Sequence, residues 1–182
     1  VTGDNNVGVG NNAGDSLTSG ASNTFIGAEA GLSTTTGAES VAVGRQALRA
    51  EDGHGQNTAV GMQALEDQNA GAVGNNTAVG HIAGRRMTTG IDNTLIGKSA
   101  GTALTTGEQN VIIGSTAGDA LTDADRNTAV GFASLGVNTK SDRNTAIGRS
   151  ALENLNHTSV TSGLNTAIGH GSGSIITTGT KN

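Results

Sequence analysis

Few side chains in this sequence could act in acid–base catalysis or bind a metal, and their spacing keeps them apart. His81 and His170 occupy the same position of a 17-residue repeat but lie five copies apart, while His54 and His157 stand alone. A metal site needs several such ligands around one point, and a glycosidase needs two carboxyl groups roughly 5 to 9.5 Å apart in a cleft. The sequence contains no pattern for either. We therefore expect no enzymatic activity, no cofactor and no metal.

The charged residues fall in columns that predict surface ladders. Arg49, Glu66 and Arg85 occupy the tenth position of successive copies, where stacked charges would alternate in sign. The pairs Asp125–Arg126 and Asp142–Arg143 occupy equivalent positions of adjacent copies, which would allow diagonal pairing. Exposed pairs of this kind contribute about a few tenths of a kcal/mol each. We interpret them as structural.

The elements that hold these residues are copies of one unit, Asn93-Thr94-Leu95-Ile96-Gly97. Seven of the nine intervals between copies are 17 residues, and the other two are 19 and 21. A fixed period of this kind is typical of a solenoid, so we expect one repeat per coil. We number the repeat from its Asn, which makes its Gly position 5. The ten copies begin at Asn6, Asn23, Ser40, Asn57, Asn76, Asn93, Asn110, Asn127, Asn144 and Asn165.

Positions 2 to 4 predict a short strand, because side chains in a strand alternate between two faces. Position 2 is Thr or Val and position 4 is Val or Ile in every copy, so we expect both to point into the coil. Position 3 would then point outward, yet it is never polar. A strand that is apolar on both faces is buried on both faces. We therefore expect position 3 to form the contact between chains, with Phe25, Leu95, Ile112, Ala129, Ala146 and Ala167 in it.

The rest of the repeat predicts two turns and a second strand. Position 5 is always Gly, which indicates a positive φ or a close approach to the next coil. Position 8 is always Ala or Ser, and one large apolar side chain comes from either position 9 or position 12, as at Leu48 and Leu104. Such exchange suits a closely packed interior. Positions 12 to 14 predict the second strand, and the glycine at position 15 predicts the second turn.

Composition supports a narrow repetitive fold. The chain has 182 residues with 30 Gly, no Pro, no Cys and two aromatic residues, both Phe, and its net charge is −5. This charge predicts no nucleic-acid partner. No apolar run approaches the roughly 18 residues that span a membrane. We expect residues 1–182 to be a single repetitive segment of a longer fibrous chain.

Two stretches resemble the repeats of known fibrous proteins. Glu39-Ser40-Val41-Ala42-Val43-Gly44 nearly matches the Asn-Ser-Val-Ala-Ile-Gly signature of trimeric autotransporter adhesins, the YadA-like head. Asn93 to Gly107 is similar to repeats of bacteriophage tail fibres, in which Asn-Thr-Ala-Ile-Gly, a small-residue segment and Thr-Thr-Gly recur. The resemblance covers the whole chain. It implies an all-β, left-handed parallel β-roll of about ten coils, assembled as a homotrimer.

These observations predict a structural role. We expect a rigid spacer in an extracellular fibre, either a virion tail fibre or a cell-surface adhesin. Its partners would be its own copies and, through flanking regions, a host-cell or surface receptor such as a glycan. The insertions at 66–75 and 153–164 are the alternative contact surface, because such loops often carry recognition. A second hypothesis is an ice- or surface-binding solenoid that uses Thr and Asn ladders.

Overall fold

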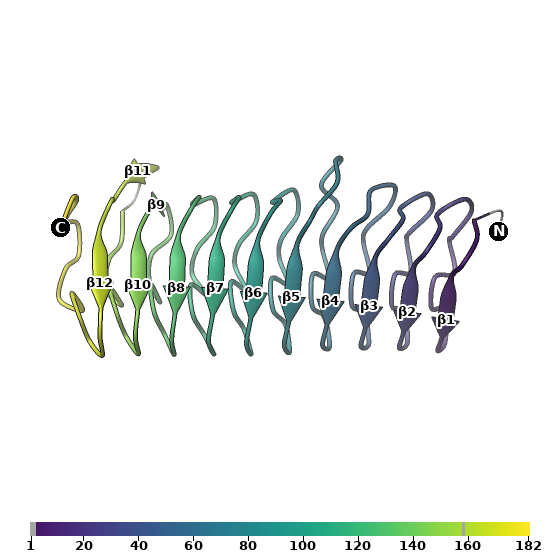
Figure 1. The fold of residues 1–182 in the computed structure, drawn as a ribbon, viewed down its shortest axis with the longest axis horizontal. Coiled ribbons are helices and arrows are strands. Elements are labelled where there is room, and N and C mark those ends of the chain that lie inside the picture. The colour runs from purple at the N-terminus through teal and green to yellow at the C-terminus, as the bar shows by residue number, and fades with distance from the viewer. Residues whose placement is uncertain (1–2, 158) are drawn as a thin grey trace.

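The chain folds as an all-β parallel β-solenoid of about nine turns. The computed structural model describes residues 3–157 and 159–182, and this part of the chain contains no helix. Each repeat adds one strand to a ten-stranded sheet, with β1 and β12 at opposite ends of a rod (Figure 1). In spatial order the strands are Val7–Val9 (β1), Thr24–Ile26 (β2), Val41–Val43 (β3), Thr58–Val60 (β4), Thr77–Val79 (β5), Thr94–Ile96 (β6), Val111–Ile113 (β7), Thr128–Val130 (β8), Thr145–Ile147 (β10) and Thr166–Ile168 (β12).

Equivalent repeat positions stack directly upon one another along the sheet. Ile96 pairs with Val79 on one side and with Ile113 on the other. The two insertions do not shift this register, because β4 still pairs with β5 and β10 with β12 at equivalent positions. The predicted arrangement of one repeat per coil is therefore confirmed.

The glycine at position 5 is required for two separate reasons. At Gly97 the backbone has φ +133°, a conformation that residues with a side chain rarely adopt. A Cβ atom on Gly97 would also lie 2.6 Å from the carbonyl carbon and oxygen of Gly114 in the next coil. The same close approach recurs from coil to coil, so a side chain at this column would push neighbouring coils apart.

Replacing Gly97 by Ala should lower the free energy of unfolding by about 3 to 5 kcal/mol, because it adds backbone strain and overpacking together. Gly71→Ala is the matched control. Gly71 also has a positive φ, of +67°, but a Cβ there would meet nothing within 4 Å. That variant should lose only about 1 kcal/mol. Chemical denaturation followed by circular dichroism compares the two, and equal losses would contradict the close-approach argument.

Three further corners of each coil have positive φ. They lie at positions 7, 9 and 17. Residues other than glycine occupy nearly all corners at positions 7 and 17, whereas position 9 is either glycine or leucine. Ile82 at position 7 has φ 53° and Leu48 at position 9 has φ 50°. Such conformations cost roughly 1 to 2 kcal/mol for a residue with a side chain. The stacking of neighbouring coils therefore imposes these corners against local preference.

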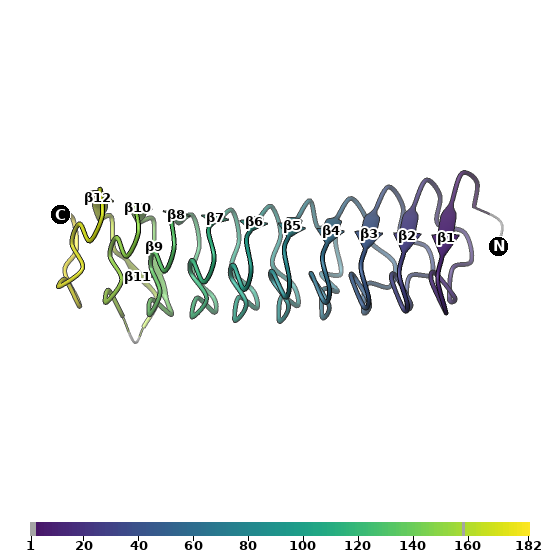
Figure 2. The same ribbon diagram turned by 90° about the horizontal axis from the view of Figure 1, so that it is seen from below.

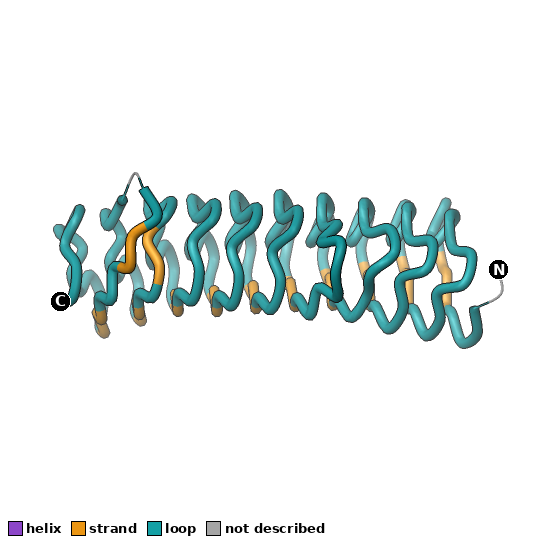
Figure 3. The backbone as a smooth tube through the Cα atoms, turned by 90° about the horizontal axis from the view of Figure 1, so that it is seen from above, coloured by secondary structure: helices purple, strands orange, loops and turns teal. Residues whose placement is uncertain are grey.

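The second side of the coil is not a continuous strand, so the prediction for positions 12 to 14 is wrong. These residues form bends, in which successive backbone N–H groups converge on one carbonyl of the next coil. The N–H groups of Thr88, Thr89 and Gly90 all donate to the Thr105 carbonyl, at 2.9, 3.2 and 3.2 Å. One short exception is the pair Ser141–Asp142 (β9) and Thr161–Ser162 (β11), where the larger insertion extends the coil. In Figure 3 this pair lies apart from the row of ten main strands.

The core lies inside each coil of the single chain and reverses the predicted strand faces. Position 3, not positions 2 and 4, points inward. The six side chains predicted to join chains are all buried within their own coil, so that prediction is wrong; they are Phe25, Leu95, Ile112, Ala129, Ala146 and Ala167. They pack with the small residue of position 8 and with the large one from position 9 or 12, such as Leu48 and Leu104, as predicted.

A ladder of buried asparagines joins the two sides of the coil. Asn110 Oδ1 accepts the backbone N–H of Asn127 at 2.9 Å. Its Nδ2 donates to Asn93 Oδ1 at 3.0 Å and to the carbonyl of Ala124, across the coil, at 2.9 Å. Buried backbone groups must be hydrogen-bonded, and position 1 meets this need at the start of each strand. This role was missed from the sequence, although an Asn in nine of ten copies is a visible signal.

Candidate functional site

The most distinctive surface is a stripe of uncharged side chains along the ten-stranded sheet, which we call the outer stripe. It consists of positions 2 and 4, which alternate with the buried position 3. Many of its Val and Ile side chains are exposed, for example Val9 at 57% and Ile96 at 37%. The members are Val7, Val9, Thr24, Ile26, Val41, Val43, Thr58, Val60, Thr77, Val79, Thr94, Ile96, Val111, Ile113, Thr128, Val130, Thr145, Ile147, Thr166 and Ile168.

The size of the outer stripe indicates an interaction surface. Ten strands about 4.8 Å apart give a length of roughly 45 Å, and three residues per strand give a width of roughly 10 Å. The resulting face, of about 450 Å², is as large as the largest apolar patch on a typical soluble monomer, a patch that is often functional. Its strands are buried by their own coil on one face only, so the stripe is the surface that a partner would cover.

Two rows of residues border the outer stripe. The leading edge is position 17, two residues before each strand begins, and it includes Glu39 and Asp92. The trailing edge is position 6, immediately after the glycine turn, and it includes Arg45, Lys98 and His81. These five side chains are all exposed. His170 also lies on the trailing edge, at the far end of the rod from the first strand, so the histidines of this row are separated as the sequence predicted.

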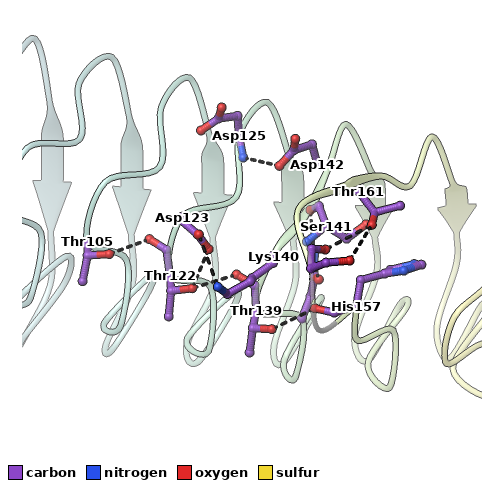
Figure 4. A network of polar contacts seen from close by, with 12 residues as sticks. Thr105, Thr122, Asp123, Asp125, Thr139, Lys140, Ser141, Asp142, His157 and Thr161 are labelled. Carbon is purple, nitrogen blue, oxygen red and sulfur yellow. Dashed lines mark hydrogen bonds and ion pairs between the residues drawn. The ribbon is translucent and has the colours of Figure 1, made fainter.

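The threonine column on another side of the rod uses its hydroxyls within the chain. Thr105 Oγ1 donates to the carbonyl of Thr122 at 3.0 Å, and Thr122 Oγ1 donates to the carbonyl of Thr139 at 3.1 Å (Figure 4). The column is interrupted by Asp52 and Asn69, as the sequence shows. The arrangement ties each bend to the next coil, which is a structural use of the hydroxyl.

The acidic residues beside this column bind backbone amides rather than the arginines expected to pair with them. Asp142 accepts the backbone N–H of Asp125 at 2.9 Å (Figure 4). Burial raises the pKa of Asp142 above its ordinary value, whereas this hydrogen bond and two arginines lower it. Arg126 instead donates to Gln109, and Arg143 donates to Ser162. The diagonal pairs predicted from the sequence are therefore not formed.

The predicted ladder of alternating charges is present. Arg85 Nε lies 3.0 Å from Glu66 Oε2, and Arg49 Nη1 lies 3.6 Å from Glu66 Oε1. Arg49 also contacts Glu29 at 3.4 Å in the preceding coil. Both arginines are more than 40% exposed, so each contact stabilises the fold by at most about 1 kcal/mol. The ladder is a surface feature of the coil stack.

Glu51 is a buried carboxyl group at position 12 of its coil. Most coils with glycine at position 9 carry a large apolar residue at position 12, but this coil has Leu48 at position 9 instead. Its side chain is 0% exposed. Its oxygens accept the backbone N–H of His54 at 3.2 Å and the side-chain amide of Asn57 at 3.1 Å. In most other coils that amide binds the preceding Asn, but Ser40 occupies the position here. Burial raises the pKa of Glu51 from its ordinary 4.5 to about 7.

Glu51 should make the stability of the fold depend on pH. A raised pKa means that the folded chain holds the proton more tightly, so the stabilisation is complete below pH 4.5 and is lost as the pH rises to about 7. The loss is about 3 kcal/mol by linkage. Glu51→Gln should remove most of this slope, because the amide does not titrate. The site should accept Gln, since Gln68 is buried at the same position of the next coil.

Denaturation midpoints measured from pH 4 to pH 8 check this prediction. Asp67→Asn is the matched control, because Asp67 is exposed and its change also removes one negative charge. The control should keep the slope of the unmodified chain. A slope that survives in Glu51→Gln would show that other groups cause it, of which Asp119 and Asp142 have raised pKa values as well.

The two insertions lie on the surface of otherwise regular coils. In the first, Gly71, Ala72 and Val73 form an extension beside β4, and the residues on both sides return to the usual register. The second contains β11, which pairs with β9. Residue 158, within the second insertion, lies outside the described residues. Figure 2 shows β11 on the side of the rod away from the main strands.

No metal site is evident in the described residues, where no group of three or more His, Asp or Glu side chains could hold an ion. The same part of the chain contains no helix that could cross a membrane. Comparisons of the chain with protein-family models, with curated proteins and with solved structures each found no match. The function must therefore be inferred from the outer stripe and the coil geometry.

Proposed function

We propose that this chain is a structural spacer segment of a homotrimeric fibre, in which three copies pack along the outer stripe. The observation that carries the proposal is the stripe itself: twenty uncharged positions form one continuous face that their own chain leaves open. A second copy with the same stripe is the simplest partner for it, and identical subunits usually assemble with rotational symmetry. The resemblance to adhesin heads and tail fibres supplies the number three and the left-handed coil.

The spacer role follows from the way in which length is built. Each coil adds about 4.8 Å to the rod, and the register between coils is the same from β1 to β12. A stack of this kind sets the distance between whatever is attached at its two ends. We place the fibre outside the cell or on a virion, where it would hold a receptor-binding part away from its anchor, without enzymatic activity of its own.

Deletion of residues 110–126, one whole repeat, tests this role in the protein that carries the segment. The rod should shorten by about 4.8 Å, and the protein should still bind its target. Deletion of residues 93–126 should shorten it by twice as much, which electron microscopy of aligned fibres can measure. If binding disappears while the trimer survives, the segment itself recognises the target. Separate shortening of the loops at 66–75 and 153–164 would then show whether they form the contact.

A further inference from the structure

The two edges of the outer stripe carry opposite charges at the same levels of the rod. At β3, the leading edge has Glu39 and the trailing edge has Arg45. At β6, the leading edge has Asp92 and the trailing edge has Lys98. These are the two acidic residues of the leading edge, and each has a cation across the same strand. The stripe is therefore bordered by matched charges rather than by one sign.

None of these four charges is neutralised within its own chain. Glu39 accepts a hydrogen bond from Gln56 at 2.8 Å, and Asp92 accepts one from Asn75 at 3.1 Å, so both carboxylates have only uncharged partners. Arg45 contacts the sulfur of Met62 at 3.6 Å. In the described part of the chain, no ion pair includes any of the four.

Elsewhere in the described residues, ion pairs join six of the charged side chains. Glu66 lies between Arg49 and Arg85, and Lys140 lies 3.6 Å from Asp123. The trailing edge also lies in a band, repeat positions 2 to 8, that contains only one of the 15 acidic residues of the chain, Glu29. The cations of the trailing edge therefore depend on another molecule for a carboxylate partner.

Rotational packing about an axis parallel to the rod brings these edges together. In such an assembly the end of a strand in one copy lies beside the start of the equivalent strand in the next copy. The trailing edge of one copy then faces the leading edge of its neighbour, level by level. We propose that Glu39 pairs with Arg45, and Asp92 with Lys98, between neighbouring copies, and that these ion pairs select the in-register, parallel arrangement. The inference rests on the proposed self-association along the outer stripe.

Other arrangements lose these pairs. A shift of one coil in one direction places Glu39 against Met62 and Arg126 against Arg149, a contact between two cations. An antiparallel arrangement brings each edge against the same edge of the neighbouring copy, so neither Glu39 with Arg45 nor Asp92 with Lys98 can pair. The in-register arrangement instead places Arg126 beside the exposed ring of Phe132, which is favourable for a cation. Like charges between subunits oppose the wrong register, which is how charged edges give specificity.

One level of the in-register arrangement contains two cations, Arg143 and Arg149. Each already has contacts within its own chain. Arg143 donates to Ser162, whereas Arg149 lies 5.7 Å from the centre of the Phe132 ring and its Nη1 is 3.0 Å from His170 Nε2. These contacts direct both side chains along the rod. Opposite charges of neighbouring copies therefore meet at the levels of β3 and β6.

Charge reversal and its rescue test the proposal, with sedimentation velocity as the measurement. The variant Glu39→Lys with Asp92→Lys places cations on both edges, so its assembly should weaken at least 10-fold and the weakening should diminish at high salt. Adding Arg45→Glu and Lys98→Glu restores opposite charges at both levels and should restore assembly. Circular dichroism confirms that each exposed-site variant is folded. Failure of the fourfold variant to recover would overturn the ion pairs.

Cysteine cross-linking tests the register independently, because the chain contains no cysteine of its own. A chain with Glu39→Cys and Arg45→Cys should give covalently linked multimers with a short bis-maleimide. The matched chain with Glu39→Cys and Met62→Cys, displaced by one coil, should give few. Preferential linking of the displaced pair would overturn the in-register arrangement. If the unmodified chain sediments as a monomer, the self-association of the proposed function fails instead, so the two failures are distinguishable.

Discussion

Replacing Ile112 by Asp is expected to unfold the chain, or to lower its free energy of unfolding by more than about 5 kcal/mol. Ile112 is 0% exposed and belongs to the core inside the coil. An aspartate there would be a buried charge without a partner, in addition to the apolar contacts that are lost. Thermal and chemical denaturation of the single-chain species, followed by circular dichroism, measure the loss.

Val111→Asp is the matched control, since Val111 is the preceding residue in the same strand. Its side chain is 38% exposed on the opposite face. We expect a loss of about 1 kcal/mol or less in the unassociated chain, because an exposed charge keeps its water. Similar losses for the two variants would contradict the assignment of strand faces.

Charges on the outer stripe should instead separate the subunits and leave each chain folded. Ile96→Asp combined with Ile147→Asp places two carboxylates per chain on a face that self-association would bury. Like charges brought together away from water should weaken assembly by at least about 1,000-fold, which corresponds to roughly 4 kcal/mol. Sedimentation velocity should therefore show monomers for this variant and trimers for the unmodified chain.

Thr106→Asp is the control for that experiment. Thr106 is exposed on the side of the bends, away from the main strands, so a charge there should leave the assembly intact. Dissociation by this control would indicate a contact surface other than the outer stripe. An unmodified chain that remains monomeric at high concentration would contradict the assembly itself.

The period of the repeat was sufficient to predict the coil stack, its register and the glycine turn. These features depend on distances along the chain, which a sequence displays directly. The stacking of Ile96 between Val79 and Ile113 is one result. The charge ladder through Glu66 is another, since equivalent positions of successive coils must be neighbours.

The direction of the strand faces could not be obtained from periodicity alone. Alternation separates positions 2 and 4 from position 3 but does not say which set is inside, because all three are apolar or nearly so. Ala at position 3, as at Ala42, suits the interior, where the large side chain of position 9 or 12, here Leu48, occupies the remaining space. The bulkier Val and Ile are left for the outer stripe.

The second strand was wrongly predicted for a related reason. The β-branched pair Thr105-Thr106 favours an extended backbone, but Leu104 in front of it must point into the core and the asparagine ladder requires the carbonyl of Gly107. The segment therefore bends. The combination of Ser40 in place of the ladder asparagine and a buried Glu51 is equally hard to predict from the sequence. It depends on the contact of Glu51 with the Asn57 amide.

The coil-to-coil hydrogen bonds have a mechanical consequence, because they join neighbours along the axis of the rod. A pulling force on its two ends acts on these contacts in series, so coils detach one at a time. Each detached coil of 17 residues extends to about 55 to 60 Å, roughly twelve times its folded rise of about 4.8 Å. The coils with two and four additional residues would yield correspondingly longer steps. A rod built in this way lengthens under tension by increments while its remaining coils stay folded.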